Sequence, residues 1–165
     1  MTIKSYKLAT AQAMKTMKKQ CDSDEFTKEC RAAAHDKIKA ATCKKGFLNW
    51  SKLPNLIGQN TKIKKDVTSL QTDLEIWGLS LAPHWVSGFN TCNGLSMGCA
   101  LNCLMFTGMG QKFMVASDGK HKVAIARIVR SILWFKYRDQ FKARLLLEIE
   151  RKAARLQNKN ITMAF

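Results

Sequence analysis

Three cysteines spaced C-x6-C-x3-C constrain this chain more than any other feature. They are Cys92, Cys99 and Cys103. An apolar run over residues 76–83 precedes them, and a segment bearing glycine and serine follows Cys92, which predicts a strand, a loop and then a helical turn. Cys99 and Cys103 are four residues apart, so they share one face of a helix. Because α/β folds place their chemistry at the carboxyl ends of strands, we predict that the three thiols converge on a metal ion or cluster.

Two kinds of metal centre fit three thiolates, and the sequence leaves both open. Zn²⁺ takes tetrahedral sets of sulfur and nitrogen ligands, and either His84 or His121 can supply the fourth ligand. An iron–sulfur cluster is the other choice, because the order of strand, cysteine loop and helix is similar to that of radical S-adenosylmethionine enzymes. Those enzymes usually have the spacing C-x3-C-x2-C. The alternatives to a metal site are cysteines that are simply buried, or a cysteine nucleophile with His84 as its base.

The balance of charge indicates a polyanionic partner. Lysine and arginine total 28 against 12 acidic residues, giving a formal net charge of +16. A charge this large favours binding to nucleic acid, most simply DNA, over a lysine-rich surface without a partner. Trp85 lies outside the predicted strand, where it can stack on a base. The residues expected to contact nucleic acid are Lys62, Lys64, Lys65, Trp85, Lys112, Arg127 and Arg130.

The expected compartment is the cytoplasm. The sequence has no apolar run of about 18 residues that would predict a transmembrane helix, and its polar first residues are unlike a signal peptide. We therefore expect no membrane partner. In a reducing compartment the six cysteines should be free thiols.

Helical patterns dominate both ends of the chain. Residues 1–52 predict a basic helical N-terminal region, with a second helix beginning after Asp22 or Ser23. Residues 118–157 predict two helices that divide near Arg138–Asp139, with Asp139 as the cap of the second. The first of these should bury Val123, Ile125, Ile128, Val129, Ile132 and Phe135; the second should bury Phe141, Leu145, Leu146 and Ile149 and expose Arg144, Glu148, Arg151, Lys152 and Arg155.

One strong strand is predicted over residues 74–83, a nearly continuous apolar run that ends at Pro83. Residues 161–165 are predicted to begin another strand. A strand followed by a helical pair predicts a helix-rich α/β fold, namely the first βα unit or units of a parallel or barrel-like arrangement. The expected boundaries are 1–52 for the basic helical region and 53–165 for a cysteine-motif α/β domain.

The segments from residue 60 onward form an ordered series of short motifs. They are N-T-K-I-K-K at 60–65, L-S-L-A-P at 79–83, S-G-F-N-T-C at 87–92, C-A-L-N-C-L at 99–104, T-G-M-G at 107–110, and the helical positions Ala126, Arg127, Phe135, Arg138, Phe141, Leu145, Glu148 and Ile149. This series resembles a phage family known as gene product eighty-eight. That family usually has proline where Asn93 stands and a basic residue where Met109 stands. It also continues into further βα units, so about residues 60–165 are expected to match its N-terminal part.

Together these features predict a phage-encoded basic protein that associates with nucleic acid and carries a three-cysteine metal or cluster site. The resemblance implies a role in phage DNA metabolism in the cytoplasm of an infected bacterial host. One alternative is a nucleic-acid-modifying enzyme, similar to radical S-adenosylmethionine enzymes or to zinc-bearing transglycosylases. Another is an inhibitor that binds a host protein. Because a barrel enzyme takes its catalytic groups from several strands, this short chain favours binding over catalysis.

Overall fold

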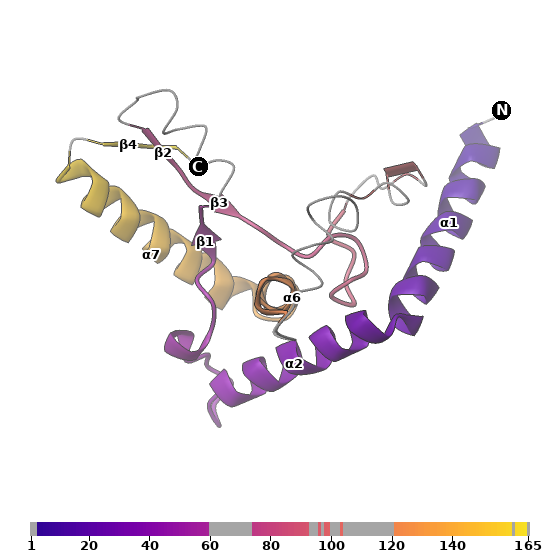
Figure 1. Cartoon of the computed structure of the whole chain (residues 1–165), viewed down its shortest axis with the longest axis horizontal. Helices are drawn as coiled ribbons and strands as arrows, with labels where there is room; N and C mark the ends of the chain where they lie inside the picture. The colour runs from indigo at the N-terminus through magenta and orange to yellow at the C-terminus, as the bar shows by residue number, and fades with distance from the viewer. Residues whose placement is uncertain are drawn as a thin grey trace.

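The protein, seen in a computed structural model, has a helix-rich α/β fold with small sheets (Figure 1). The structure describes residues 3–59, 74–92, 96, 98–99, 103, 121–159 and 161–164. The helical elements are α1 (Ile3–Ser23), α2 (Glu25–Ala41), the 3-10 turn η1 (Trp50–Lys52), α6 (Lys122–Lys136) and α7 (Arg138–Gln157). The strands are β1 (Ile57–Gly58), β2 (Leu74–Ile76), β3 (Gly78–Leu79) and β4 (Thr162–Ala164). The predicted fold class is therefore confirmed.

A single non-helical residue, Asp24, separates α1 from α2 and fixes where α2 begins. Its backbone is extended, and its carboxylate accepts a hydrogen bond from the amide of Thr27 at 2.8 Å. Glu25 follows in the first turn, where a negative charge suits the helix dipole. The cap thus lies just beyond the predicted Asp22 or Ser23. Figure 1 shows that α1 then leads away from α2 at an angle.

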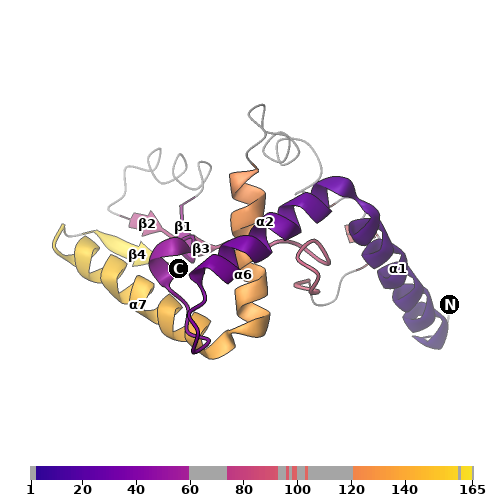
Figure 2. The same cartoon turned by 90° about the horizontal axis from the view of Figure 1, so that it is seen from below.

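The main core forms where α2 crosses α6 (Figure 2). Buried positions on α2 recur every three or four residues, so the helix presents one packing face along its length. The segment that follows α2 adds three leucines, and α7 adds the fully buried Phe141. The buried residues of α2 are Thr27, Cys30, Ala34, Ile38 and Ala41; those of α6 are Ala124, Ile128, Val129, Ser131, Ile132 and Leu133.

The break between α6 and α7 falls at Tyr137, whose backbone leaves the helical region with φ −129° and ψ 44°. This confirms the predicted division, although Asp139 lies in the first turn of α7 and does not cap it. Beyond the break, the ring of Phe141 packs edge-to-face against Trp134 with centroids 5.5 Å apart. This contact fixes the start of α7 against the end of α6.

Several residues of the two C-terminal helices were predicted to lie on the wrong face, buried or exposed. Val123, Phe135 and Leu146 were expected to be buried but are exposed, Leu146 at 61%. Glu148 was expected to be exposed but is only 7% exposed. The reason is that α7 packs along β1 and β4 as well as against α6, which turns a different face inward. Phe135 instead stacks on the ring of Phe89, with centroids 4.8 Å apart.

The predicted single strand over residues 74–83 is also wrong, because the segment divides into two short strands with different partners. β2 pairs in parallel with β4, with Glu75 opposite Met163. β3 pairs in antiparallel fashion with β1, with Leu79 opposite Ile57. The predicted C-terminal strand is confirmed as β4. The apolar run is shared between two sheets, and the residues of β2 and β3 are half-buried and not fully enclosed.

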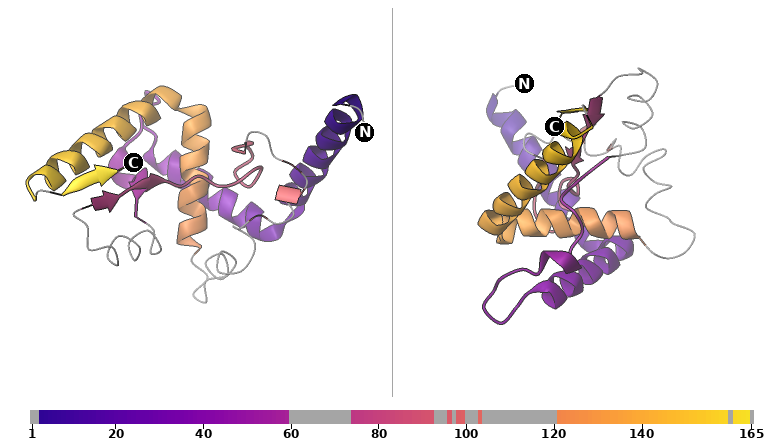
Figure 3. Two further views of the ribbon diagram at one scale, coloured as in Figure 1. Left: turned by 90° about the horizontal axis from the view of Figure 1, so that it is seen from above. Right: turned by 90° about the vertical axis from the view of Figure 1, so that its left-hand side faces the viewer.

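From β3 the chain runs past α6 toward the angle between α1 and α2 (Figure 1). Figure 3 shows that the N-terminal end of α1 stands apart from α6 and α7, whereas β4 lies beside α7. In the described part of the chain, no helix combines the length and the apolar character needed to cross a membrane.

Candidate functional site

The candidate site is built on a compact loop, residues 82–92, whose two ends are joined. At its start, the amide of Ala82 donates a hydrogen bond to the hydroxyl of Ser131 on α6 at 2.9 Å. At its end, the hydroxyl of Thr91 donates to the carbonyl of Ala82, and the amide of Thr91 donates to the carbonyl of His84 at 3.3 Å. These bonds close the loop on itself and fix it to the buried face of α6.

His84 takes an unusual backbone conformation within this loop. Its φ of 33° lies in the left-handed region, which residues with a β-carbon rarely adopt. In this conformation the amide of His84 donates a hydrogen bond to Sγ of Cys92 at 3.2 Å. The amide of Cys92 donates to Oδ1 of Asn90 at 3.1 Å. A hydrogen bond donated to sulfur stabilises negative charge there, as the second shell of a thiolate metal site does.

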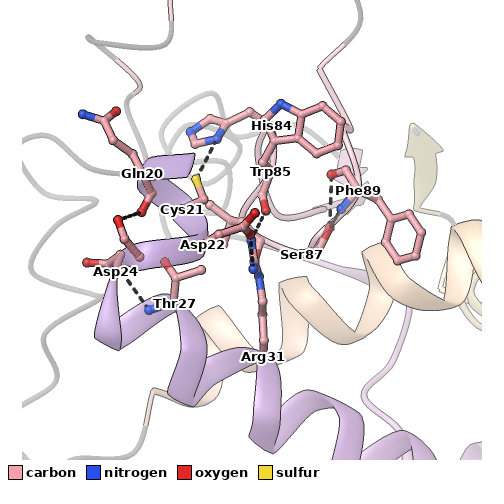
Figure 4. Close-up of polar contacts among 12 residues, drawn as sticks. Gln20, Cys21, Asp22, Asp24, Thr27, Arg31, His84, Trp85, Ser87 and Phe89 are labelled. Carbon is pink, nitrogen blue, oxygen red and sulfur yellow. Dashed lines mark hydrogen bonds and ion pairs between the residues drawn. The ribbon is translucent and has the colours of Figure 1, made fainter. Parts of the chain in front are cut away.

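Arg31 on α2 holds the loop against the two N-terminal helices (Figure 4). Its Nε donates to the carbonyl of Val86 at 2.8 Å, and its Nη2 donates to the carbonyl of Trp85. Its Nη1 pairs with the carboxylate of Asp22 at 2.6 Å. One guanidinium therefore connects α1, α2 and the loop that carries His84.

The side chain of His84 faces α1 and contacts Cys21 (Figure 4). Cys21 Sγ lies 3.5 Å from His84 Nδ1, and both residues are buried. Burial raises the pKa of the Cys21 thiol to about 11, although Arg31 acts to lower it. Burial also lowers the pKa of His84. Both shifts favour a neutral thiol beside a neutral imidazole.

The three predicted thiols have different environments. Cys92 and Cys103 are half-buried, and Cys103 packs against the main core. Cys103 is also near enough to Cys21 to raise the pKa of that thiol further. Cys99 is exposed, and its amide donates to the Ser96 hydroxyl at 3.1 Å. Within the described residues, no three His, Cys, Asp or Glu side chains are arranged to hold a metal ion, so the predicted metal site stays a prediction.

The two histidines predicted as possible fourth ligands of zinc, His84 and His121, lie in different parts of the structure. His84 is in the loop beside Cys92. His121 precedes α6, and its ring meets the ring of Phe26 edge-on, with centroids 4.5 Å apart. The structure therefore brings His84 into contact with two cysteine sulfurs, that of Cys21 through its ring and that of Cys92 through its amide.

Only some of the residues predicted to contact nucleic acid lie in the part of the chain that the structure describes. Lys62, Lys64, Lys65 and Lys112 lie outside the described residues, and Arg127 is half-buried on α6. Arg130 donates to the carbonyl of Asn55 at 2.7 Å and to that of Ser80 at 3.3 Å, and burial lowers its pKa. Trp85 is half-buried, with Lys18 Nζ 5.5 Å from the centre of its ring. These residues stay predictions as nucleic-acid contacts, and Arg130 already has a structural role.

Sequence reasoning missed Cys21 and Arg31, the two N-terminal residues that complete this region. Cys21 was expected to be a buried apolar residue, and it is buried. Its neighbour His84 is 63 positions away along the chain, so no ligand spacing could have revealed the contact. Arg31 was one of many basic residues in the predicted helical N-terminal region. Only the angle between α1 and α2 brings either residue to the loop.

Comparison with known proteins identifies a family but no characterised relative. The family described as gene product 88 matches residues 52–165, which is more than half of the chain and includes the loop with its cysteines. No curated protein and no solved structure matches the chain. Residues 1–51, which contain Cys21 and Arg31, lie outside the matched segment. The chain therefore belongs to the phage gene product 88 family.

Proposed function

We propose that this phage protein binds nucleic acid, most simply DNA, through phosphate contacts, and that it acts in phage DNA metabolism in the host cytoplasm. The observation that carries the proposal is an excess of positive charge that is not neutralised internally. The chain has a net charge of +16. In the described part of the chain, only Lys28, Arg31 and Arg144 form ion pairs with carboxylates.

The remaining positive charge is spread over several elements. Exposed lysines and arginines lie on α1, on α2, in the turn after α2 and on α7. Such a distribution attracts a polyanion by counterion release and does not require a shaped pocket. The exposed basic residues include Lys15, Lys18, Lys19, Lys37, Lys39, Lys44, Lys45, Lys142, Arg151 and Arg155.

The tryptophans support a phosphate-led mode of binding. Each of the four tryptophans has a side-chain cation over its ring, at 4.2 to 5.8 Å from the ring centre. A base that stacked on one of these faces would have to displace the cation. Binding led by phosphates carries little sequence preference. The pairs are Trp50 with Arg144, Trp77 with Lys152, Trp85 with Lys18, and Trp134 with Arg138.

A metal centre is the second part of the proposal, with Cys92, Cys99, Cys103 and His84 as ligands of zinc or of an iron–sulfur cluster. The chemistry of these side chains suits a soft metal, and the amide bonded to Cys92 Sγ suits a thiolate. The centre would stabilise the loop and would not be required for phosphate contacts. Metal analysis of protein purified without oxygen, compared with a Cys92→Ser variant, tests this part.

The chemistry of the cysteine–histidine pair supports binding more than nucleophilic catalysis. A cysteine nucleophile reacts as a thiolate, usually beside a protonated histidine. Burial raises the pKa of Cys21 to about 11 and lowers that of His84, so both shifts oppose the ion pair. The direction of both shifts favours the neutral pair over the thiolate–imidazolium pair that a cysteine nucleophile uses.

The proposed binding is tested by fluorescence anisotropy with a labelled duplex over a range of salt concentrations. The logarithm of the association constant should fall linearly with the logarithm of salt concentration, with a slope of about −0.9 for each phosphate neutralised. Unrelated duplex sequences should give affinities within about threefold of each other, because phosphate contacts do not read bases. A complex that is insensitive to salt, or no complex at low salt, would overturn the proposal.

A further inference from the structure

Four cysteine and histidine residues from three distant parts of the chain are linked pair by pair. Cys21 Sγ lies 3.5 Å from Nδ1 of His84, and the amide of His84 is bonded to Sγ of Cys92. Cys103 is near enough to Cys21 for an electrostatic interaction. We propose that Cys21 of α1 is a metal ligand, which joins His84, Cys92 and Cys103 around one zinc ion. The inference rests on the proposed metal centre and puts Cys21 in the place of Cys99.

The distance between Cys21 and His84 equals that between two ligands of one zinc ion. Bonds of about 2.3 Å to sulfur and about 2.0 Å to nitrogen, at a tetrahedral angle, separate the two atoms by about 3.5 Å. The structure places them 3.5 Å apart. In the metal-free pair a proton lies between sulfur and nitrogen. When zinc takes its place, the S–H bond of Cys21 breaks, an S–Zn bond forms and the proton passes to solvent.

His84 belongs to two contacts at once, which links Cys21 to Cys92. Its ring contacts Cys21, and its backbone amide is bonded to the sulfur of Cys92. An ion held by the ring would lie beside the Cys21 sulfur, and the Cys92 sulfur contacts the backbone of the same residue. The described side chains form linked pairs and not a set of three around one point, so zinc has to draw Cys92 and Cys103 toward the ring.

The environment of Cys99 makes it the weaker choice for the third thiol. Cys99 is exposed, whereas Cys21 is 7% exposed and Cys103 packs against the same core. A buried set of ligands excludes water, which strengthens bonds to a cation and protects thiolates from exchange. Structural zinc sites are closed in this way.

The ligand set also selects zinc over an iron–sulfur cluster. Three thiolates and one imidazole form one of the ordinary tetrahedral sets for structural zinc. Iron–sulfur clusters are held mainly by thiolates alone.

Zinc at this position would fasten α1 to the loop. Cys21 lies in the last turns of α1, outside the segment that matches the family, whereas His84, Cys92 and Cys103 lie inside it. Arg31 already connects the same parts by hydrogen bonds. The metal thus adds a second connection at the angle between α1 and α2.

The inference is tested by titrating Co²⁺ into chelator-treated, reduced protein and recording its absorption. Thiolates bound to tetrahedral Co²⁺ give a near-ultraviolet charge-transfer band whose intensity grows with the number of thiolates. Cys21→Ser should lose about one third of this band and bind Co²⁺ at least about tenfold more weakly. Cys99→Ser, and Cys30→Ser as the matched buried control, should keep both the band and the affinity.

A second measurement uses the unaltered chain, so it does not depend on the folding of a variant. With zinc bound, N-ethylmaleimide should modify Cys99 as fast as in the metal-free protein, as peptide mass spectrometry can show. Protection of Cys99 by zinc, or a Co²⁺ band that is lost in Cys99→Ser and kept in Cys21→Ser, would overturn the inference and leave the metal centre standing. No Co²⁺ band in the unaltered protein would instead overturn the metal centre itself.

Discussion

At the scale of single residues, Arg31 connects three parts of the candidate site. Its guanidinium donates to two loop carbonyls and pairs with Asp22, which joins parts of the chain that are more than 50 residues apart. The carbonyl of Val86 belongs to a fully buried residue. A carbonyl that loses such a donor is left without compensation for its lost hydration. Arg31 therefore matters more for the position of the loop than for the charge of the surface.

We expect Arg31→Met to lower the free energy of unfolding by about 2–3 kcal/mol, because it removes hydrogen bonds from a charged donor to the loop. Asp22→Asn is the matched control, since it removes only the ion pair. That pair is partly exposed on the Asp22 side, at 45%, so its loss should cost less than about 1 kcal/mol. Equilibrium unfolding in urea measures both values. Equal small losses in the two variants would show that the loop does not depend on Arg31.

At the scale of elements, the contact between α7 and β1 shows how a buried carboxylate can accept backbone hydrogen bonds that a neighbouring strand would otherwise accept. β1 is only two residues long, and Glu148 on α7 accepts the amides of Leu56 and Ile57 at 2.9 and 3.2 Å. Arg144 balances the carboxylate at 2.8 Å, one turn away on the same helix. A helix side chain thus supplies the acceptors that a longer neighbouring strand would provide.

We expect Glu148→Gln to destabilise the protein by about 1–2 kcal/mol, because a neutral amide is a weaker acceptor than a carboxylate and leaves Arg144 unpaired. Amide hydrogen exchange in a peptide covering residues 53–59 should become faster. Glu150→Gln, on the exposed face of the same helix, should change neither quantity beyond about 0.5 kcal/mol. If both variants behave alike, Glu148 does not hold β1 in place.

The elements also show what the sequence could and could not reveal. The helix pattern predicted α2 and the division of α6 from α7, because long packing faces repeat at regular spacing. The run over residues 74–83 was predicted as one strand because periodicity cannot show that Ile76 and Gly78 have different strand partners. Glu148 looked like an exposed charge, since only tertiary structure reveals that two amides face it.

At the scale of the whole molecule, the site depends on contacts that no local pattern records. The closeness of His84 to Cys92 could be predicted, because eight residues in a closed loop bring them together. The contact of Cys21 with His84 arises only when α1 and α2 meet at Asp24. The family match at residues 52–165 confirms the predicted relationship but leaves that N-terminal contribution outside it.

The charge of the whole molecule leads to a prediction about which lysines meet phosphate. Changing Lys62, Lys64 and Lys65 together to Gln removes three positive charges from the basic motif of the family match. If each lysine neutralises one phosphate, the magnitude of the salt slope should fall by roughly 2.7, at about 0.9 per contact on duplex DNA. The matched control changes three exposed lysines of α2 and the following turn, Lys37, Lys39 and Lys44, to Gln.

The control removes the same charge from the spread positive charge of α2 and the turn after it, which we expect to attract DNA at long range without each lysine holding a phosphate. Because charges farther apart than about 8 Å are largely screened at physiological ionic strength, lysines outside the contact surface should affect the slope little. The control variant should therefore lower the affinity by less than about threefold and change the slope by less than about 1. Anisotropy titrations of both variants at about 50 and 200 mM salt separate the two results. Equal changes in the two slopes would mean that phosphate is held by the diffuse charge of the molecule and not by the lysines of this motif.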